Sequence, residues 1–402
     1  MTNESNSGNS ATGCGRESVV ENALGAARNG NGKPHRVVVK IGTSTLIDDD
    51  GMLRVGYLFE VARQVHDLRK QGIDAVIVSS GAIGVGLRRL GMGSRRPSDI
   101  PTLQAAAAIG QVELSSKYSE ALAHYDLKMA QVLITRYETG GRESYLHARD
   151  TMERLLELGI VPLINENDTV VVDEIKFGDN DTLATLVATM IKADLVILLS
   201  DIEGLYTADP RTSEDAELLE HVGALTEELY NAAGGSGSAY GSGGMITKIK
   251  AARVLMAAGI PMVICEGSKP NVIADVASGK QIGTIFDSDS APHANARKLW
   301  IALGGNPRGS VTIDAGAANA LRECGSSLLP VGIREVEGSF GSGDAIGIYD
   351  ESHMLVGRGL ARLSNEQIAR AMGKNSQALA ADPELADLKD KVAVHRDEMV
   401  VF

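Results

Sequence analysis

Cysteine is scarce in this sequence, with three residues among 402. Cys14, Cys265 and Cys324 lie far apart, and none of them belongs to a CxxC pair. A disulfide framework needs several paired cysteines, and a structural zinc site usually takes its thiolates from such short motifs. The spacing therefore argues against both and predicts plain thiols in a reducing compartment.

The chain also lacks a long apolar run and a surplus of basic residues. No stretch approaches the roughly 18 to 20 apolar residues that cross a bilayer, and the first residues contain no apolar signal core. The formal net charge is -13, whereas binding to phosphate backbones or anionic membranes usually needs a basic surface. We expect a cytoplasmic protein with no membrane association.

Standard nucleotide-binding signatures are missing as well. The sequence has no GxxxxGK[ST] loop, no GxGxxG fingerprint and no HRD or DFG kinase motif. If this chain handles phosphate groups, it must do so by another route.

Strand-like and helix-like segments alternate through the first two thirds of the chain. Alternation of this kind predicts an α/β three-layer sandwich with a largely parallel central sheet. The strand-like segments cover residues 35–46, 73–86, 128–135, 160–168, 193–206 and 259–267, and the helix-like ones cover 56–72, 103–125, 181–193 and 247–259.

Both ends of the chain have a different composition. Residues 1–34 are rich in Asn, Gly and Ser, which predicts a disordered extension. After a polar, Pro-containing connector, short β-like pieces predict a small, mainly β second domain. The expected organisation is an extension at 1–34, an α/β domain at 35–290, a linker at 291–299, a second domain at 300–378 and a tail at 379–402.

Chemically suggestive side chains follow several of the predicted strands. In a parallel sheet the carboxyl ends of the strands share one edge, where ligands usually bind. Taken singly, each residue is more simply read as a turn or a solvated charge, but together they predict a site at this edge. They are Lys40, Gly42, Ser80, Asp168, Ser200 and Asp201.

A glycine-rich stretch precedes the predicted helix at 247–259. Glycines bring backbone N–H groups close to phosphate, and a helix N-terminus adds partial positive charge. The simpler alternative is a flexible linker. We predict a phosphate contact made by Ser242, Gly243, Gly244, Met245, Ile246, Thr247 and Lys248.

The stretch from Ile164 to Thr182 concentrates carboxylates and amides, among them Asp168, Asn180 and Asp181. Such a density could ligate a metal, accept a proton, receive an ammonium group or lie in solvent. The composition of the stretch does not choose among these roles.

The motifs in their order resemble those of the amino acid kinases, most closely the glutamate 5-kinase type. The resemblance covers about residues 36–402, and its end from about residue 300 is similar to a PUA domain. It rests on "VVVKIGTS", "VSSGAIGVG", "VPLINENDTV", "KFGDNDTLA", "LLSDIEGLYTADPR", "GSGGMITK" and "VAVHRDEMV", with "GSSLLPVGI" in the second domain.

This resemblance implies transfer of the ATP γ-phosphoryl group to the side-chain carboxylate of L-glutamate, the first step of proline biosynthesis. It makes Lys40 and Lys248 the phosphoryl-binding cations, oriented by Asp181 and Asp201. It also implies that ATP contacts Lys40, Gly42, Ser200, Asp201 and residues 242–248. Mg²⁺ would arrive bound to ATP, with no metal cage built from protein side chains.

On the acceptor side, the resemblance places Ser80, Asp168 and Asn180 around the substrate. A carboxylate suits the ammonium group of glutamate, so Asp168 is assigned to it. Ser80 and Asn180 can donate hydrogen bonds to a carboxylate without adding charge. Asp173 and Glu174 are left as solvated loop charges.

Further expectations concern partners. The family is commonly inhibited by proline and commonly homo-oligomeric, and a glutamyl phosphate reductase is a possible partner. RNA binding is not expected, because residues 298–402 contain 11 Lys and Arg against 14 Asp and Glu. The alternatives are another acid kinase, such as N-acetylglutamate kinase or aspartate kinase, and a PUA-containing RNA-binding protein.

Overall fold

The computed structural model describes residues 33–48, 50–92, 97–135, 142–170, 180–210, 213, 215–226, 229, 244–287, 307–383 and 385–402. The predicted linker at 291–299 and nearly all of the predicted extension at 1–34 lie outside these residues. The expected boundaries at those two places therefore stay predictions.

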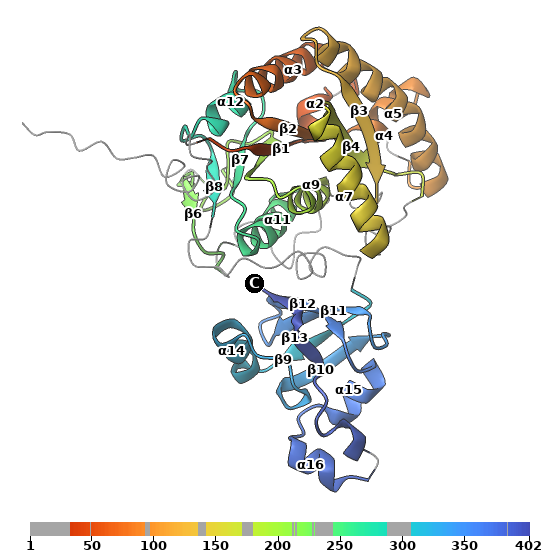
Figure 1. Cartoon of the computed structure of the whole chain (residues 1–402), viewed down its shortest axis with the longest axis vertical. Helices are drawn as coiled ribbons and strands as arrows, with labels where there is room; N and C mark the ends of the chain where they lie inside the picture. Colours follow the sequence, from red (N-terminus) through yellow and green to blue (C-terminus); the bar gives the residue numbers. More distant parts are fainter. Residues whose placement is uncertain are drawn as a thin grey trace, which may run out of the picture.

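An eight-stranded sheet forms the centre of the first domain (Figure 1). The strand order is β3-β4-β2-β1-β5-β7-β8-β6, and neighbours run parallel except for the antiparallel pair β7–β8. The largely parallel sheet predicted from the sequence is confirmed. Its strands are β1 (Arg36–Ile41), β2 (Asp74–Val78), β3 (Met129–Ile134), β4 (Val161–Glu166), β5 (Leu195–Ser200), β6 (His221–Val222), β7 (Met262–Glu266) and β8 (Thr284–Phe286).

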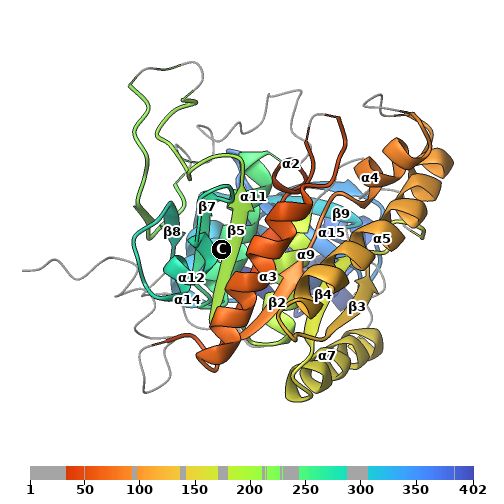
Figure 2. The same ribbon diagram turned by 90° about the horizontal axis from the view of Figure 1, so that it is seen from above.

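Helices cover both faces of this sheet, because its central strands are apolar on both sides. Val38 and Val76 belong to the core on one face, whereas Val37 and Ile77 belong to the core on the other. Figure 2 shows the layer nearer the viewer, with α3 and α5, crossing in front of the strands. The first face carries α7 (Arg142–Glu157), α9 (Asn180–Met190) and α11 (Met245–Ala257), and the second carries α3 (Val55–Lys70), α5 (Ile100–Ala123) and α12 (Val272–Ala277).

Two short helices follow the first two strands: α2 (Thr43–Leu46) after β1 and α4 (Ala82–Arg89) after β2. Gly81 precedes α4 with φ 92°, a left-handed conformation that favours glycine. The turn between β2 and α4 therefore depends on this glycine.

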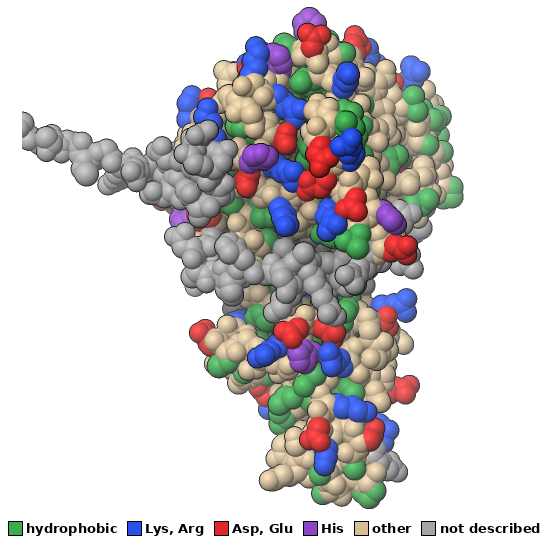
Figure 3. All heavy atoms as spheres, viewed as in Figure 1, with side chains coloured by type: hydrophobic (Ala, Val, Ile, Leu, Met, Phe, Trp, Pro, Cys, Tyr) green, Lys and Arg blue, Asp and Glu red, His purple; other side chains and the backbone are tan. Residues whose placement is uncertain are grey.

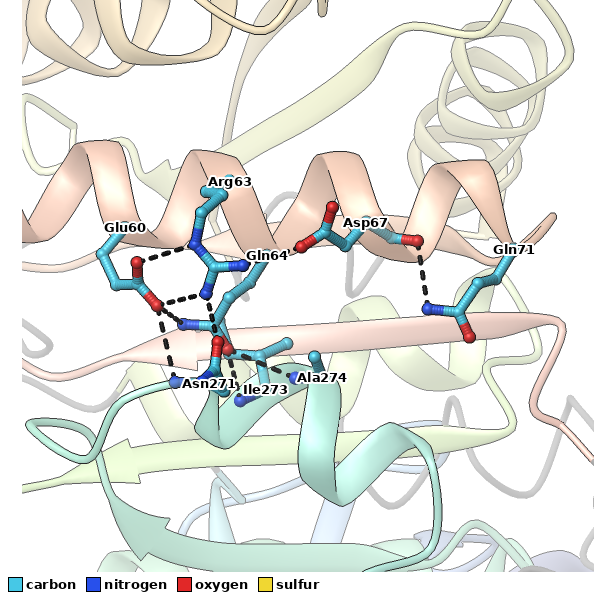
Figure 4. A network of polar contacts seen from close by, with 8 residues as sticks. All are labelled: Glu60, Arg63, Gln64, Asp67, Gln71, Asn271, Ile273 and Ala274. Atoms are coloured by element: carbon cyan, nitrogen blue, oxygen red, sulfur yellow. Dashed lines mark hydrogen bonds and ion pairs between the residues drawn. The ribbon is translucent and has the colours of Figure 1, made fainter.

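A buried glutamine ties the loop after β7 to α3 (Figure 4). Gln64 of α3 is 2% exposed, and its Oε1 accepts hydrogen bonds from the backbone N–H groups of Ile273 (2.8 Å) and Ala274 (3.2 Å). These groups lie in the first turn of α12, where they have no partner within the helix. Gln64 thus acts as a cap for α12 and fixes the loop that follows β7.

The second domain contains a five-stranded sheet with the order β10-β9-β11-β12-β13. Its neighbours are antiparallel except for β9–β11. The elements are β9 (Gly309–Ile313), α14 (Ala315–Cys324), β10 (Ile333–Gly338), β11 (Ala345–Asp350), β12 (Leu355–Ala361), α15 (Asn365–Ala371), α16 (Ser376–Ala381) and β13 (Val394–Val401).

The structure corrects two expectations in this domain. The piece at 310–321 was expected as β-like, but its residues from 315 onward form helix α14, whose first turn is capped by the Asp314 side chain accepting from the Ala317 N–H at 2.8 Å. Part of the expected tail at 379–402 is β13, which pairs with β12 inside the sheet. The chain end is therefore an integral part of the second domain.

The end of the chain also meets the first domain. Val400 is 2% exposed and belongs to the same apolar core as α9 and α11, and Phe402 packs against that core. Arg253 of α11 donates a hydrogen bond to the backbone oxygen of Leu355, at 2.9 Å. The helix that carries Lys248 therefore touches the second domain.

Among the described residues, no helix is both long enough and apolar enough to cross a bilayer.

Candidate active site

Lys40 lies near the carboxyl end of the central strand β1 and is 7% exposed. Strand β1 pairs with β2 on one side and β5 on the other, so the lysine is enclosed by neighbouring strands. The next turn stays close to the sheet, because the Gly42 N–H donates to Leu199 O at 3.2 Å. A Cβ at Gly42 would lie 3.3 Å from that oxygen and 3.8 Å from Lys40 Nζ. Glycine here leaves room beside the ammonium group.

One aspartate joins the two predicted phosphate-binding lysines. Asp181, in the first turn of α9, is 2% exposed. Its Oδ1 lies 2.7 Å from Lys40 Nζ, and its Oδ2 lies 3.3 Å from Lys248 Nζ. The Thr247 hydroxyl donates to the same Oδ2 at 2.7 Å. The structure thus brings together residues that are more than 200 positions apart in the sequence.

The charge state of this cluster follows from its contacts. Burial alone would raise the pKa of Asp181, but the ammonium groups of Lys40 and Lys248 outweigh it and hold that pKa well below its ordinary value. Helix α9 adds to this effect, because its N-terminal end favours negative charge. The cluster therefore carries one negative and two positive charges, with a net positive charge that suits a phosphate anion.

Lys248 sits in the first turn or two of α11, as the sequence predicted. Gly244 precedes the helix as its N-cap, and within the described part of the chain no side chain caps the first turn. The N–H groups of such a turn favour an anion. Met245, Ile246 and Thr247 contribute this first turn, whereas the predicted contacts Ser242 and Gly243 lie outside the described residues.

The predicted residues at the end of β5 take separate positions. Ser200 is 6% exposed, and its hydroxyl lies 3.1 Å from Asp201 Oδ1. Asp201 is exposed and, in the described part of the chain, forms no ion pair with Lys40 or Lys248. In this structure Asp181 bridges both ammonium groups, and the expected role of Asp201 in orienting a lysine stays a prediction.

On the other side of β1, Ser80 follows β2 and is half-buried. Ser79 before it is fully buried, and its hydroxyl lies 3.2 Å from the Tyr118 hydroxyl. Burial raises the pKa of Tyr118, so this phenol stays neutral. The buried, uncharged contact between Ser79 and Tyr118 thus helps to fix the turn at Ser80.

Asn180 begins α9, directly before Asp181. Its Nδ2 donates to Ser79 O at 2.5 Å and to Asn165 Oδ1 at 2.9 Å. Both of its N–H groups are used inside the protein, which conflicts with the expected donation to a substrate carboxylate.

Asp168 lies half-buried in the turn after β4. The predicted loop charges Asp173 and Glu174 lie outside the described residues.

Two residues with no predicted role are part of this arrangement. Asn165 and Gln111 are 2% and 8% exposed, and Asn165 Nδ2 donates to Gln111 Oε1 at 2.7 Å. A buried amide at the end of strand β4 was a possible signal for Asn165. The sequence offered none for Gln111, which lies in the middle of a long helix.

Asp181 is the carboxylate at this edge that the described contacts pair with cations. Across the residues that the structure describes, no group of three or more His, Cys, Asp or Glu side chains is placed to hold a metal ion. The chemistry that the described cluster supports is electrostatic binding of an anion.

Comparisons with known proteins identify the family of each domain. The model of the amino acid kinase family matches residues 35–266, and the PUA domain model matches residues 309–381. A protein of Pelobacter propionicus named glutamate 5-kinase is 44% identical over 370 residues, which is 92% of this chain and 98% of that protein.

Two further proteins with the same name have similar coverage. The one from Meiothermus ruber is 44% identical over 90% of this chain and 94% of its own length. The one from Chromohalobacter salexigens is 43% identical over 94% of this chain and 98% of its own length. The chain belongs to the amino acid kinase family and, within it, to the glutamate 5-kinases.

Proposed function

We propose that this protein transfers the γ-phosphoryl group of ATP to the side-chain carboxylate of L-glutamate, giving L-glutamyl 5-phosphate and ADP. One carboxylate oxygen forms a bond to the γ-phosphorus as the bond to the bridging oxygen of ADP breaks. The observation that carries this proposal is the buried cluster in which Asp181 holds Lys40 and Lys248 side by side. Family membership supports the choice of substrates.

The chemistry needs charge neutralisation more than proton transfer. Glutamate titrates around pKa 4.3, so its side chain is already an anion near neutral pH and needs no general base. The obstacle is to bring this anion to a polyanionic nucleotide. The ammonium groups of Lys40 and Lys248 are largely buried, so they attract the transferred group more strongly than solvent-exposed charges would.

ATP is placed on the side of the site formed by β5 and α11. The open first turn of α11 offers backbone N–H groups to phosphate oxygens, and Ser200 and Asp201 lie at the end of β5. Mg²⁺ would be part of the nucleotide substrate and would neutralise part of the phosphate charge. We infer that it enters bound to ATP.

Glutamate is placed on the side formed by β2, β4 and the start of α9. Asp168, Ser80 and Asn180 lie at the ends of these three elements. The Asp168 carboxylate complements the ammonium group of glutamate, and the Ser80 hydroxyl can donate to a carboxylate. A site with an acceptor for an ammonium group separates glutamate from substrates whose amine is blocked.

Changing Asp168 to asparagine is expected to raise the KM for glutamate about tenfold or more, because a charged hydrogen bond contributes about 1.5–3 kcal/mol. The KM for ATP should change less than about twofold. A coupled assay of ADP release, run with glutamate and with N-acetylglutamate, measures both. Equal effects on the two KM values would contradict the role of Asp168, and faster turnover of N-acetylglutamate would contradict the proposed substrate.

Two expectations about regulation and partners rest on the resemblance. Proline is proposed as a feedback inhibitor, and adding it to the same assay checks this. A glutamyl phosphate reductase is proposed as the partner that captures the labile acyl phosphate. Its addition should raise the yield of reduced product without releasing more free acyl phosphate.

We also propose that the chain forms a homo-oligomer. Val112 and Ile109 on α5 are 70% and 38% exposed, and Leu133 lies on β3, the last strand on this side of the sheet. Figure 3 shows hydrophobic side chains gathered over α4 and α5. An edge strand beside apolar side chains suits a second copy of the chain. Light scattering should give a molar mass of at least two chains, and the Val112→Glu variant should shift it toward one.

A further inference from the structure

Three buried or half-buried amides form a continuous chain of hydrogen bonds beneath the acceptor side of the site. Gln111 of α5 accepts from Asn165 of β4 at 2.7 Å, and Asn165 accepts from Asn180 of α9 at 2.9 Å. The chain thus links a helix on one face of the sheet to a helix on the other. In the described contacts, none of these three side chains forms a hydrogen bond with Lys40 or Lys248.

The backbone determines which way each amide points. A backbone N–H can only donate and a carbonyl oxygen can only accept. The Glu166 N–H contacts Asn165 at 2.9 Å, so the atom it meets is the oxygen. Ser79 O contacts Asn180 at 2.5 Å, so the atom it meets is the nitrogen. Because these two contacts fix the amide orientations, an N–H of Asn165 Nδ2 donates to Gln111 Oε1.

This direction limits what Asn180 can offer a ligand. Its two N–H groups are taken by Ser79 O and Asn165 Oδ1, which leaves the side-chain oxygen for a ligand. An oxygen attracts an ammonium group and repels a carboxylate. The other end of these linked amides, Gln111 Nε2, is buried and has no hydrogen-bond partner among the residues that the structure describes. Of the Gln111 side-chain amide, only the oxygen forms a hydrogen bond among the described contacts.

We propose that Gln111 is a positioning residue of the acceptor site. Through Asn165 it holds the Asn180 amide with its oxygen toward the substrate, so that Asn180 and Asp168 together bind the ammonium group. This inference rests on the proposed glutamate kinase function. It also assigns the substrate carboxylates to other donors, such as the Ser80 hydroxyl.

The first test compares two substitutions of Gln111. Gln111→Met keeps the length of the side chain but removes the oxygen that receives Asn165, whereas Gln111→Glu keeps an oxygen there. We expect Gln111→Met to raise the KM for glutamate about tenfold, with the KM for ATP changed less than about twofold. Gln111→Glu should stay within about threefold of the wild type for both. Thermal melts identify variants that fail to fold.

The outcomes separate this inference from the proposed function. If the wild type releases no ADP with glutamate, the proposed function fails and the inference with it. If the wild type is active and Gln111→Met keeps its glutamate KM, only the inference fails. If Gln111→Glu is as weak as Gln111→Met, Gln111 Nε2 contacts a substrate carboxylate directly, which overturns a positioning role.

The second test does not depend on a variant. A crystal structure of the wild type with glutamate bound should place the ammonium nitrogen within hydrogen-bond distance of both Asn180 Oδ1 and Asp168. A substrate carboxylate in contact with the Asn180 side chain would overturn the proposal. This test remains decisive if Gln111→Met does not fold.

Discussion

Replacing Asp181 with asparagine is expected to lower kcat at least about a hundredfold and to reduce the free energy of unfolding by about 3–5 kcal/mol. Asp181 is the one carboxylate that the described contacts place between the buried ammonium groups of Lys40 and Lys248. Without its charge, two buried cations face each other unpaired. The reacting phosphoryl group then loses two cations held in fixed positions.

The stability loss should depend on pH in a defined direction. The pKa of Asp181 is lowered from an ordinary value of 3.8. Its stabilising contribution is therefore fully present above that value and is lost as pH falls through the lowered folded-state pKa. Urea unfolding of wild type and Asp181→Asn should give a constant difference between about pH 5 and 8 and a shrinking one below about pH 4. A difference that grows on acidification would contradict the assigned charges.

An exposed ion pair of the same length supplies the control. Asp275 Oδ1 lies 2.7 Å from Lys280 Nζ, but the Lys280 side chain is 63% exposed. Exposed pairs contribute about 0–1 kcal/mol, so Asp275→Asn should change the free energy of unfolding by less than about 1 kcal/mol and leave kcat unaltered. A similar loss in both variants would mean that burial of Asp181 is not the source of its effect.

Adding ATP should stabilise Asp181→Asn more than the wild type, because phosphate supplies the missing negative charge.

The parallel sheet and the phosphate side of the site were predictable from the sequence for a physical reason. Buried parallel strands are continuous apolar runs, and polar residues directly after them must lie at one edge. Lys40 follows this logic, and Lys248 was expected on the helix after the glycine-rich stretch, whereas the role of Asp181 came from the resemblance. The structure brings the charged atoms of these three residues within 2.7 to 3.3 Å. Several local patterns, each weak by itself, agreed in placing the phosphate side of the site at this edge of the sheet.

Other features depend on contacts that no local pattern encodes. Gln111 and Asn165 are 54 positions apart and meet only because α5 packs across the end of β4. The direction of the Asn180 amide likewise depends on a backbone oxygen 101 positions away. The role assigned to Asp201 came from the resemblance alone, and its exposed side chain forms no ion pair with either lysine among the described contacts.

Helix α14 shows a different limit, since its sequence did contain the missed signal. Four of its ten residues are alanine, the best helix former, and Asp314 before it is a favourable N-cap residue. The segment was predicted as β-like because the segments on either side of it are β-like, and this outweighed its own alanine content. Strand β13 was missed because its pairing with β12 is a tertiary contact.

Replacing Gly110 with alanine is expected to reduce the free energy of unfolding by about 3 kcal/mol or more, at the upper end of the range for overpacked cores. A Cβ at Gly110 would lie 1.9 Å from Ala82 O and 2.6 Å from Gly86 N. Both are backbone atoms of α4, so no side chain can rotate away and the two helices must separate. Because α4 follows Ser80 and Gly81 directly, the KM for glutamate should rise as well.

A glycine in another helix isolates this effect from helix propensity. Gly56 of α3 is exposed, and a Cβ there would meet nothing within 4 Å. Gly56→Ala should therefore leave stability unchanged or raise it by up to about 1 kcal/mol, since alanine favours a helix over glycine. Urea unfolding of both variants measures the contrast. If Gly110→Ala is as stable as Gly56→Ala, α4 and α5 do not pack backbone to backbone, and the turn that carries Ser80 must be held in place by other contacts.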